Sequence, residues 1–156
     1  ADAEFGQPNL RYYGYLDAMK SADITVEDNW VAGADYTIQG AYKAAKQMLG
    51  NPRHAPSAIF CASDEMGFGT IMAAKDLGLE VPKDISVIGV DNHDMSDFFE
   101  LSTISQNARE QGIAAAQMML DTLADPDLGN HVNFDQIIPW PVKIVVRGST
   151  AKATSR

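Results

Sequence analysis

The sequence predicts an α/β fold in which a mostly parallel sheet carries helices on both faces. Two short, continuously apolar runs, residues 57–62 and 85–90, have the length and composition of strands covered on both sides. Segments in which apolar residues recur every three or four positions alternate with these runs, as amphipathic helices do. Strands that alternate with helices imply right-handed crossovers and parallel pairing. The 156 residues match the size of one ordinary domain.

The N-terminal part is predicted to hold two helices separated by an extended segment. The first helix covers residues 7–20, where apolar residues repeat at helical spacing. Residues 28–33 are expected to form a short strand or an extended edge. The second helix covers residues 37–49, because Thr37 is a good N-terminal cap and Gly50 is a common stop.

The middle of the chain alternates between strand and helix signals. After the strand at 57–62, a helix is expected over residues 64–77, capped by Ser63 or Asp64 and ended by a glycine. The second buried strand, 85–90, follows a proline, and residues 101–105 form a third short strand. Three strands in this order give the parallel part of the sheet.

The last third is predicted to add one long helix and an edge of the sheet. Residues 107–123 have apolar residues along one helical face. Residues 134–138 and 142–147 read as strands separated by prolines, which suits an edge or a crossover better than a central position. The small and polar tail, residues 149–156, is expected to be flexible.

Composition narrows the class of protein. Twelve Lys and Arg against 21 Asp and Glu give a net charge of −9, so this chain is a poor candidate for contacting nucleic acid itself. A single cysteine, Cys61, excludes an intrachain disulfide and suits a reducing compartment. No apolar run is long enough for a bilayer, and residues 1–6 lack a signal-peptide pattern. A cytoplasmic location is expected.

Polar side chains follow three strands of the predicted sheet. Asp64 comes after the first, Asp91 after the second and Gln106 after the third. Because the carboxyl ends of parallel strands share one edge, these groups should converge on one crevice. Carboxylates and an amide suit a hydroxyl-rich ligand, Arg11 could supply a forked donor, and Tyr36 an aromatic surface. Sequence therefore predicts a small-molecule site at this edge.

Each of these residues also has a plain structural interpretation. Asp64 could serve only as a helix cap, and Asp91 with its polar neighbours could be a solvated turn. Arg11 on an amphipathic helix is more often a surface charge, and Tyr36 is more often packing. A hydrolase using Asp64 and Asp91 as paired carboxylates is an alternative that lacks a neighbouring base or metal cluster. Neither a metal nor a cofactor is expected, and the chain is not expected to be an enzyme.

Several stretches resemble blocks of one known family, in that family's order. Residues 57–66 read SAIFCASDEM, residues 78–91 read GLEVPKDISVIGVD and residues 101–106 read LSTISQ. They resemble the blocks P-T-A-I-F-x-x-N-D-x-M, G-L-x-V-P-x-D-I-S-V-x-G-x-D and P-L-T-T-x-x-Q of the LacI/GalR (lactose repressor) family of bacterial transcription regulators. RYYGY at 11–15 and VVRGST at 145–150 are similar to two further blocks.

The resemblance implies a truncated, type I periplasmic-binding-protein-like lobe that senses a sugar or polyol and controls DNA binding allosterically. The positions that match effector-facing residues of the family are Arg11, Tyr36, Ser63, Asp64, Asp91 and Gln106. Ser63 stands where the family usually has asparagine. Because the serine side chain is shorter and reaches less far, either a bulkier ligand is expected to fit or that contact is expected to be mediated by water. A periplasmic sugar-binding protein of a transporter is the alternative within binding proteins.

The resemblance also implies a homodimer. In the family, the helix after the first block and the loop after the second pack across a two-fold axis. The corresponding apolar residues here are Met66, Phe68, Ile71, Met95, Phe98 and Phe99. The alternative is that Phe98 and Phe99 only cover their own sheet.

The domain organisation implied by the resemblance is a C-terminal lobe with crossover segments over residues 1–148. Residues 107–135 would belong to the N-terminal lobe of a full protein, and the DNA-binding domain would lie outside this chain. Operator DNA would therefore be contacted only through that other part. The apolar stripe of the helix at 107–123 is expected to pack against a second copy or against the sheet.

Overall fold

The computed structural model describes residues 10–124 and 138–152. A four-stranded sheet in the order β1-β2-β3-β4 forms its centre. Pairing is parallel from β1 to β3, and β4 is antiparallel to β3. The strands are β1 (Ala58–Phe60), β2 (Ser86–Val90), β3 (Ser102–Ser105) and β4 (Lys143–Val145). The predicted α/β class is confirmed, and the run at 142–147 lies at an edge as expected.

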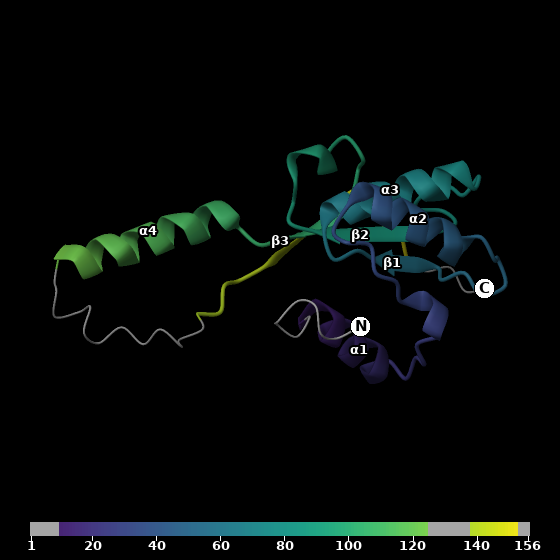
Figure 1. The fold of residues 1–156 in the computed structure, drawn as a ribbon, viewed down its shortest axis with the longest axis horizontal. Coiled ribbons are helices and arrows are strands. Elements are labelled where there is room, and N and C mark those ends of the chain that lie inside the picture. The colour runs from purple at the N-terminus through teal and green to yellow at the C-terminus, as the bar shows by residue number, and fades with distance from the viewer. Residues whose placement is uncertain (1–9, 125–137, 153–156) are drawn as a thin grey trace.

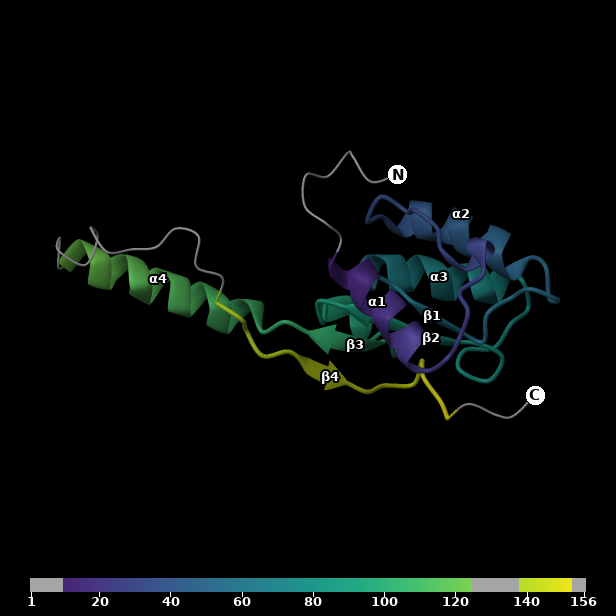
Figure 2. The same cartoon turned by 90° about the horizontal axis from the view of Figure 1, so that it is seen from below.

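Helices lie on both faces of this sheet. They are α1 (Leu10–Ser21), α2 (Ile38–Leu49), α3 (Asp64–Asp76) and α4 (Ala108–Ala124), with 3-10 helices η1 (Asp28–Trp30) and η2 (Asp94–Ser96). α2 and α3 cover one face, α1 lies on the other, and α4 stands apart beyond the end of β3 (Figure 1 and Figure 2). The four predicted helices are confirmed, although residues 7–9 of the first lie outside the described part of the chain.

The capping residues that the sequence predicts fix the ends of α2 and α3. The Thr37 hydroxyl accepts a hydrogen bond from the Gly40 amide at 3.0 Å, and the Ser63 hydroxyl accepts one from the Met66 amide at 3.3 Å. Such caps satisfy amides that have no partner within the helix. Gly78, just after α3, has a φ of 75°, a left-handed conformation that favours glycine.

The hydrophobic core fills the space between the sheet and the pair α2 and α3. Its buried residues are Ala45, Leu49, Ala73, Ala74 and Ile85 in one cluster, and Cys61, Phe68, Val87 and Leu101 in another. Burial raises the pKa of the Cys61 thiol to about 11, so this cysteine stays protonated at neutral pH.

The opposite face of the sheet is less covered than the sequence suggests. Residues 57–62 were expected to form a strand covered on both sides, yet Ala58 and Phe60 are exposed. The reason is that β1 is an edge strand, and successive side chains of a strand point to opposite faces. Ile59 turns inward to the core, whereas Phe60 faces the side of the sheet that carries α1.

The expected strand or extended edge at 28–33 is wrong for its first half. Residues Asp28–Trp30 form the 3-10 helix η1, and Val31 is extended but lies in none of the four strands. The Trp30 indole donates to the His54 carbonyl oxygen at 2.9 Å. The segment is therefore held by side-chain bonds to the loop before β1 rather than by a strand ladder.

The expected flexible tail is wrong at its beginning. Ser149 is 1% exposed, its hydroxyl donates to the Val87 carbonyl oxygen at 2.6 Å, and the Ser102 amide donates to the Ser149 hydroxyl at 2.7 Å. The Ala151 amide donates to the Ser86 hydroxyl at 3.2 Å. A polar residue at this position is stable because β2 and β3 supply its partners. Residues 153–156 of the expected tail lie outside the described residues.

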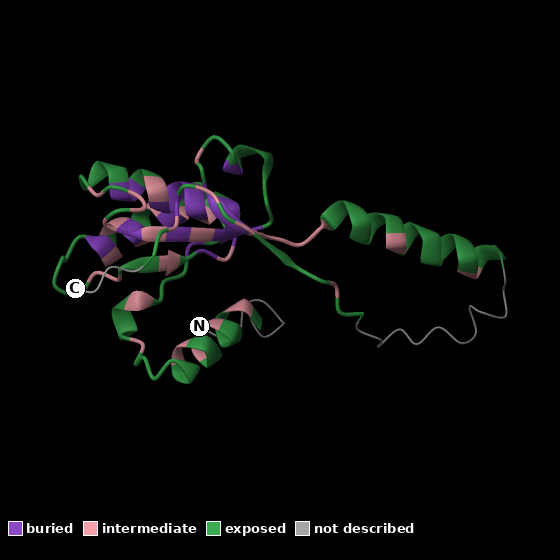
Figure 3. Ribbon diagram, turned by 180° about the vertical axis from the view of Figure 1, so that it is seen from behind, coloured by how far each residue is buried: buried purple, intermediate pink, exposed green. Residues whose placement is uncertain are grey.

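Helix α4 buries none of its residues. Met119, Leu120 and Leu123 are all at least 60% exposed, and the helix is almost entirely exposed in Figure 3. The expectation that its apolar stripe packs on the sheet is therefore wrong, because the connection after β3 carries α4 away from the sheet. Packing against a second copy stays a prediction. None of the described helices is both long and apolar enough to cross a membrane.

Candidate functional site

The fold brings Arg11, Asp91 and Gln106 together at the carboxyl ends of β2 and β3. The Gln106 side-chain amide donates to Asp91 Oδ1 at 2.5 Å, and a guanidinium nitrogen of Arg11 lies 3.9 Å from the same oxygen. Arg11 reaches this place from α1 and also donates to the Ala62 carbonyl oxygen, after β1, at 2.7 Å. Of the three side chains that were predicted to converge from strand ends, Asp91 and Gln106 meet here.

Asp91 lies in a mixed electrostatic environment. Partial burial raises the pKa of the Asp91 carboxyl above the ordinary aspartate value, while the Arg11 charge and the Gln106 hydrogen bond lower it. The nearby carboxylates of Asp64 and Glu65 add to the increase. The site therefore places one carboxylate, one guanidinium and one amide within reach of the same small ligand.

An apolar cleft of about 490 Å³ adjoins this polar group, between α1 and the exposed face of the sheet. Its lining residues are Arg11, Gly14, Tyr15, Ala18, Phe60, Val90, Ile104, Gln106 and Val142. Two of these, Arg11 and Gln106, are the partners of Asp91. Apolar walls with a few convergent polar groups are typical of small-molecule sites. Tyr15 and Phe60 were not predicted as cleft residues, because their contribution depends on where α1 crosses the sheet.

Two of the other predicted site residues lie elsewhere or are already engaged. Tyr36 is 48% exposed in the turn before α2 and is not among the residues that line the cleft. Ser63 is buried, and its hydroxyl caps α3. Among the described residues, neither Tyr36 nor Ser63 forms a hydrogen bond or ion pair with the side chains of Arg11, Asp91 and Gln106.

Asp64 is turned away from the crevice. Its side chain is 1% exposed, and its two oxygens accept hydrogen bonds from the Thr103 hydroxyl, the His93 amide and the Ser96 hydroxyl. The cap of α3 is Ser63, so the interpretation of Asp64 as a cap is wrong. A carboxylate that the chain's own donors saturate does not support the alternative of a hydrolase with Asp64 and Asp91 as a catalytic pair.

The six candidate interface residues divide between the core and the surface. Phe68 is 1% exposed and stacks on Phe99, with ring centroids 4.6 Å apart. Met66 and Ile71 are half-buried against the same cluster. Met95 and Phe98 are exposed, Phe98 at 87%. The alternative that both phenylalanines cover their own sheet therefore fits Phe99 and fails for Phe98.

Arg147 is a residue near the site that sequence reasoning did not select. Its guanidinium donates to Asp97 at 2.7 Å, to the Leu101 carbonyl oxygen at 2.8 Å and to the Asn92 side chain at 2.9 Å. One side chain after β4 thus holds the loop that follows Asp91. An arginine at the end of the predicted strand 142–147 was the signal, but its partners are 46 to 55 positions away.

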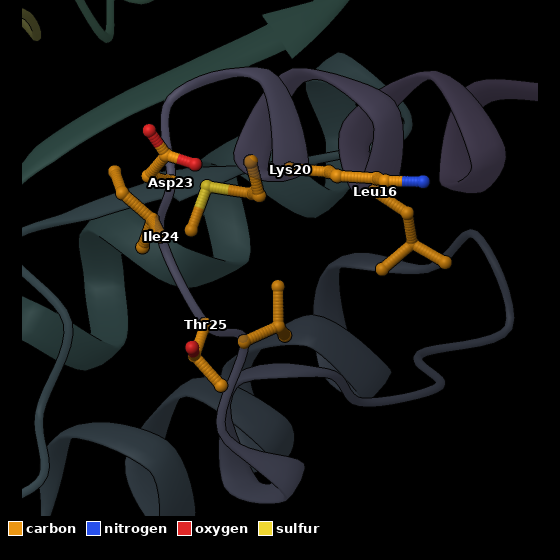
Figure 4. Close-up of a pocket in the computed structure, with 7 residues that line it drawn as sticks. Leu16, Lys20, Asp23, Ile24 and Thr25 are labelled. Carbon is orange, nitrogen blue, oxygen red and sulfur yellow. The ribbon is translucent and has the colours of Figure 1, made fainter.

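A second hollow of about 350 Å³ lies at the end of α1. Side chains of α1, including Leu16 and Lys20, and of the following segment, including Asp23 and Ile24, surround it (Figure 4). None of the predicted site residues lines this hollow.

Comparison with known proteins places these features in a family. The periplasmic binding protein-like domain family matches residues 1–150. The HTH-type transcriptional repressor PurR of Pectobacterium carotovorum is 44% identical over 124 residues, which are 78% of this chain and 36% of the repressor. PurR of Serratia proteamaculans is 44% identical over 143 residues, 90% of this chain and 40% of the repressor. The chain thus spans little more than a third of these curated relatives.

Solved structures agree with the sequence comparison. A LacI family regulator from Lactobacillus casei with bound sucrose has a TM-score of 0.79 and 25% identity, over 96% of this chain and 54% of that one. A LacI family regulator from Enterococcus faecium with bound ribose has a TM-score of 0.75 and 27% identity, over 92% and 52%. The chain therefore belongs to the periplasmic binding protein-like domain family, and it is similar to transcriptional regulators of the PurR and LacI type.

Proposed function

We propose that this chain is the ligand-sensing region of a LacI-type transcriptional regulator and that its ligand is a sugar or polyol. The observation that carries the proposal is the group of Arg11, Asp91 and Gln106 at the edge of an apolar cleft. Similar regulators bind sucrose and ribose. The regulator would act in the cytoplasm, and its DNA contacts would be made outside this acidic chain, whose net charge is −9.

A hydroxylated ligand would use both kinds of surface in the cleft. Its hydroxyl groups would donate to Asp91 and accept from the Arg11 guanidinium, and its C–H face would lie against the apolar wall that includes Tyr15 and Phe60. A ligand hydroxyl at Asp91 would compete with the Gln106 amide for the same carboxylate oxygen. Ligand binding would therefore change the contacts of Gln106.

Gln106 connects the site to α4. The Gln111 side-chain amide, in the first turns of α4, donates to the Gln106 carbonyl oxygen at 2.5 Å. A change in the contacts of Gln106 would bias the orientation of α4 and of whatever packs on its exposed apolar face. A ligand can shift a regulator from one conformation to another only if it makes different contacts in the two conformations.

The regulator is proposed to be a homodimer that uses α3 and the loop after β2. Met72 on α3 is 45% exposed, and Met95 and Phe98 in the loop are 44% and 87% exposed. Exposed apolar side chains on neighbouring elements are typical of an interface between identical subunits.

The ligand proposal is tested by titrating the intact protein with sucrose, glucose and ribose, followed by calorimetry and by operator-binding assays. We expect saturable binding of at least one of these compounds, a change in operator affinity and no chemical product. Asp91→Ala should weaken that binding by about 100-fold or more, because it removes a charged acceptor.

Asp94→Ala is the matched control. Asp94 is an exposed aspartate three positions along the same loop, and its loss should leave sugar affinity unchanged. Three results would contradict the proposal: no binding of any of the three sugars, turnover of a sugar, or undiminished binding by Asp91→Ala.

A further inference from the structure

Asp64 is a buried carboxylate whose hydrogen bonds all come from the chain itself. Oδ1 accepts from the Thr103 hydroxyl at 2.5 Å, and Oδ2 accepts from the His93 amide and the Ser96 hydroxyl, both at 2.7 Å. A buried charge is stable only when such donors compensate for the loss of water. Because both oxygens are engaged, Asp64 binds protein groups rather than an external ligand.

Two of these donors, the His93 amide and the Ser96 hydroxyl, come from the loop that begins at Asp91, and the third, the Thr103 hydroxyl, comes from β3. Asn92 is tied to the same network, since its amide donates to the Thr103 hydroxyl oxygen at 3.2 Å. Thr103 thus accepts from the loop on one side and donates to Asp64 on the other. The backbone directly after the Asp91 carboxylate is therefore anchored to α3 and β3.

The backbone at this place needs an anchor. Asp91 and Asn92 have backbone φ angles of 117° and 58°, and residues other than glycine rarely adopt positive φ angles. Such conformations persist only where the surroundings hold them. The network around Asp64 meets this requirement. The Thr103 hydroxyl accepts a hydrogen bond from the Asn92 amide, and the Asp64 carboxylate accepts one from the His93 amide.

The neighbouring strand leaves room for this carboxylate. A Cβ atom on Gly89 would collide with the Asp64 side chain, so glycine at that position of β2 lets the carboxylate reach across the strand to Thr103. The close approach of Asp64 to β2 thus depends both on the carboxylate at the start of α3 and on the glycine in β2.

We propose that Asp64, bridged by Thr103, is a positioning residue of the ligand site: it holds the loop after β2 so that the Asp91 carboxylate faces Arg11 and Gln106. Its significance for sugar sensing rests on the proposed function, whereas the positioning itself concerns contacts within the chain. Asp64 acts through Asp91 and does not touch the ligand.

Thr103→Val tests this role, because valine keeps the volume of threonine and lacks its hydroxyl. Thr103→Ser is the matched control that keeps the hydroxyl. A ligand-free readout is the NMR signal of the Gln106 side-chain amide, which reports its hydrogen bond to Asp91. In Thr103→Val this signal should move toward its position in Asp91→Ala, and in Thr103→Ser it should remain as in the parent protein.

The second readout is affinity for whichever of sucrose, glucose and ribose binds the parent protein. Thr103→Val should weaken that affinity about tenfold, because the buried Asp64 carboxylate loses a donor, the Asn92 amide loses its acceptor and the loop is released. Thr103→Ser should restore it. Amide exchange at Cys61, which is bonded to Ile88 within the sheet, should be unchanged and so exclude general unfolding.

Ser96→Ala is a second variant, which removes a donor from the other oxygen of Asp64 and should shift the Gln106 signal in the same direction. An unmoved Gln106 signal in both Thr103→Val and Ser96→Ala would overturn the positioning role. So would a moved signal with unchanged sugar affinity. If no sugar binds the parent protein, the proposed function fails, while the Gln106 signal still decides whether Asp64 positions Asp91.

Discussion

The Asp91 carboxyl is partly exposed at the proposed ligand site, and its protonation should make ligand affinity depend on pH. Its carboxyl pKa is raised mainly by burial, against the opposing influence of Arg11 and Gln106. Sugar affinity should therefore fall as the pH decreases through this raised pKa, beginning at a higher pH than an ordinary aspartate would give, because a protonated carboxyl attracts Arg11 less and accepts fewer hydrogen bonds. Calorimetric titrations between about pH 7 and about pH 4 measure this.

The stability of the fold should respond to this group in the opposite direction. A raised folded-state pKa means that protonation of Asp91 favours the folded state, so its contribution to the free energy of unfolding is present at low pH and is lost as the pH increases through the raised pKa.

Asp91→Asn is the control for the pH dependence of sugar affinity, because it removes the titrating group. Sugar affinity that depends equally on pH in Asp91→Asn would show that another group is responsible.

At the scale of single residues, sequence predicted those neighbours whose meeting follows from topology alone. Asp91 and Gln106 each follow a parallel strand, so their meeting was predictable from strand order. The role of Asp64 was not predictable, because its donors His93, Ser96 and Thr103 are 29 to 39 positions away. Only the folded loop brings those donors to one carboxylate.

The contact between α2 and α3 depends on a glycine. A Cβ atom at Gly69 in α3 would collide with the backbone of α2 at Ile38 and Tyr42. Gly69→Ala should lower the free energy of unfolding by about 2 kcal/mol, because two helix backbones must separate. Urea denaturation measures this change.

Gly14→Ala in α1 is the matched control for the same substitution. A Cβ atom there meets nothing within 4 Å, so alanine should increase the stability by up to about 1 kcal/mol through its better helix propensity. Equal stability of Gly69→Ala and the parent protein would mean that α2 and α3 can shift apart without cost.

At the scale of elements, helices were predicted more accurately than the exposed strands and turns. Helix ends follow local chemistry, as at the Thr37 and Ser63 caps. Which face of β1 is covered is a question of tertiary packing, and so is the 3-10 turn Asp28–Trp30, whose indole bonds to a distant carbonyl. Apolar content alone does not distinguish an edge strand from a central one.

At the scale of the whole molecule, the C-terminal segment and α4 show opposite deviations from expectation. The segment around Ser149 returns to the sheet and bonds to both β2 and β3. Helix α4 leaves the sheet and keeps an apolar face exposed. Both outcomes depend on contacts between parts of the chain separated by dozens of residues, or with surfaces outside the chain, which local patterns do not encode.

Assembly of two copies can be separated from folding by comparing two adjacent phenylalanines. Phe98 is 87% exposed, whereas Phe99 stacks on the buried Phe68. If the proposed dimer forms through this loop, Phe98→Ala should convert it to monomer in sedimentation equilibrium and change the free energy of unfolding of the subunit by less than about 0.5 kcal/mol. Phe99→Ala should instead lower that free energy by about 2 kcal/mol in urea denaturation, because it opens a cavity beside the core. A protein that is monomeric at every concentration, or that stays dimeric with Phe98→Ala, would exclude this loop as the interface.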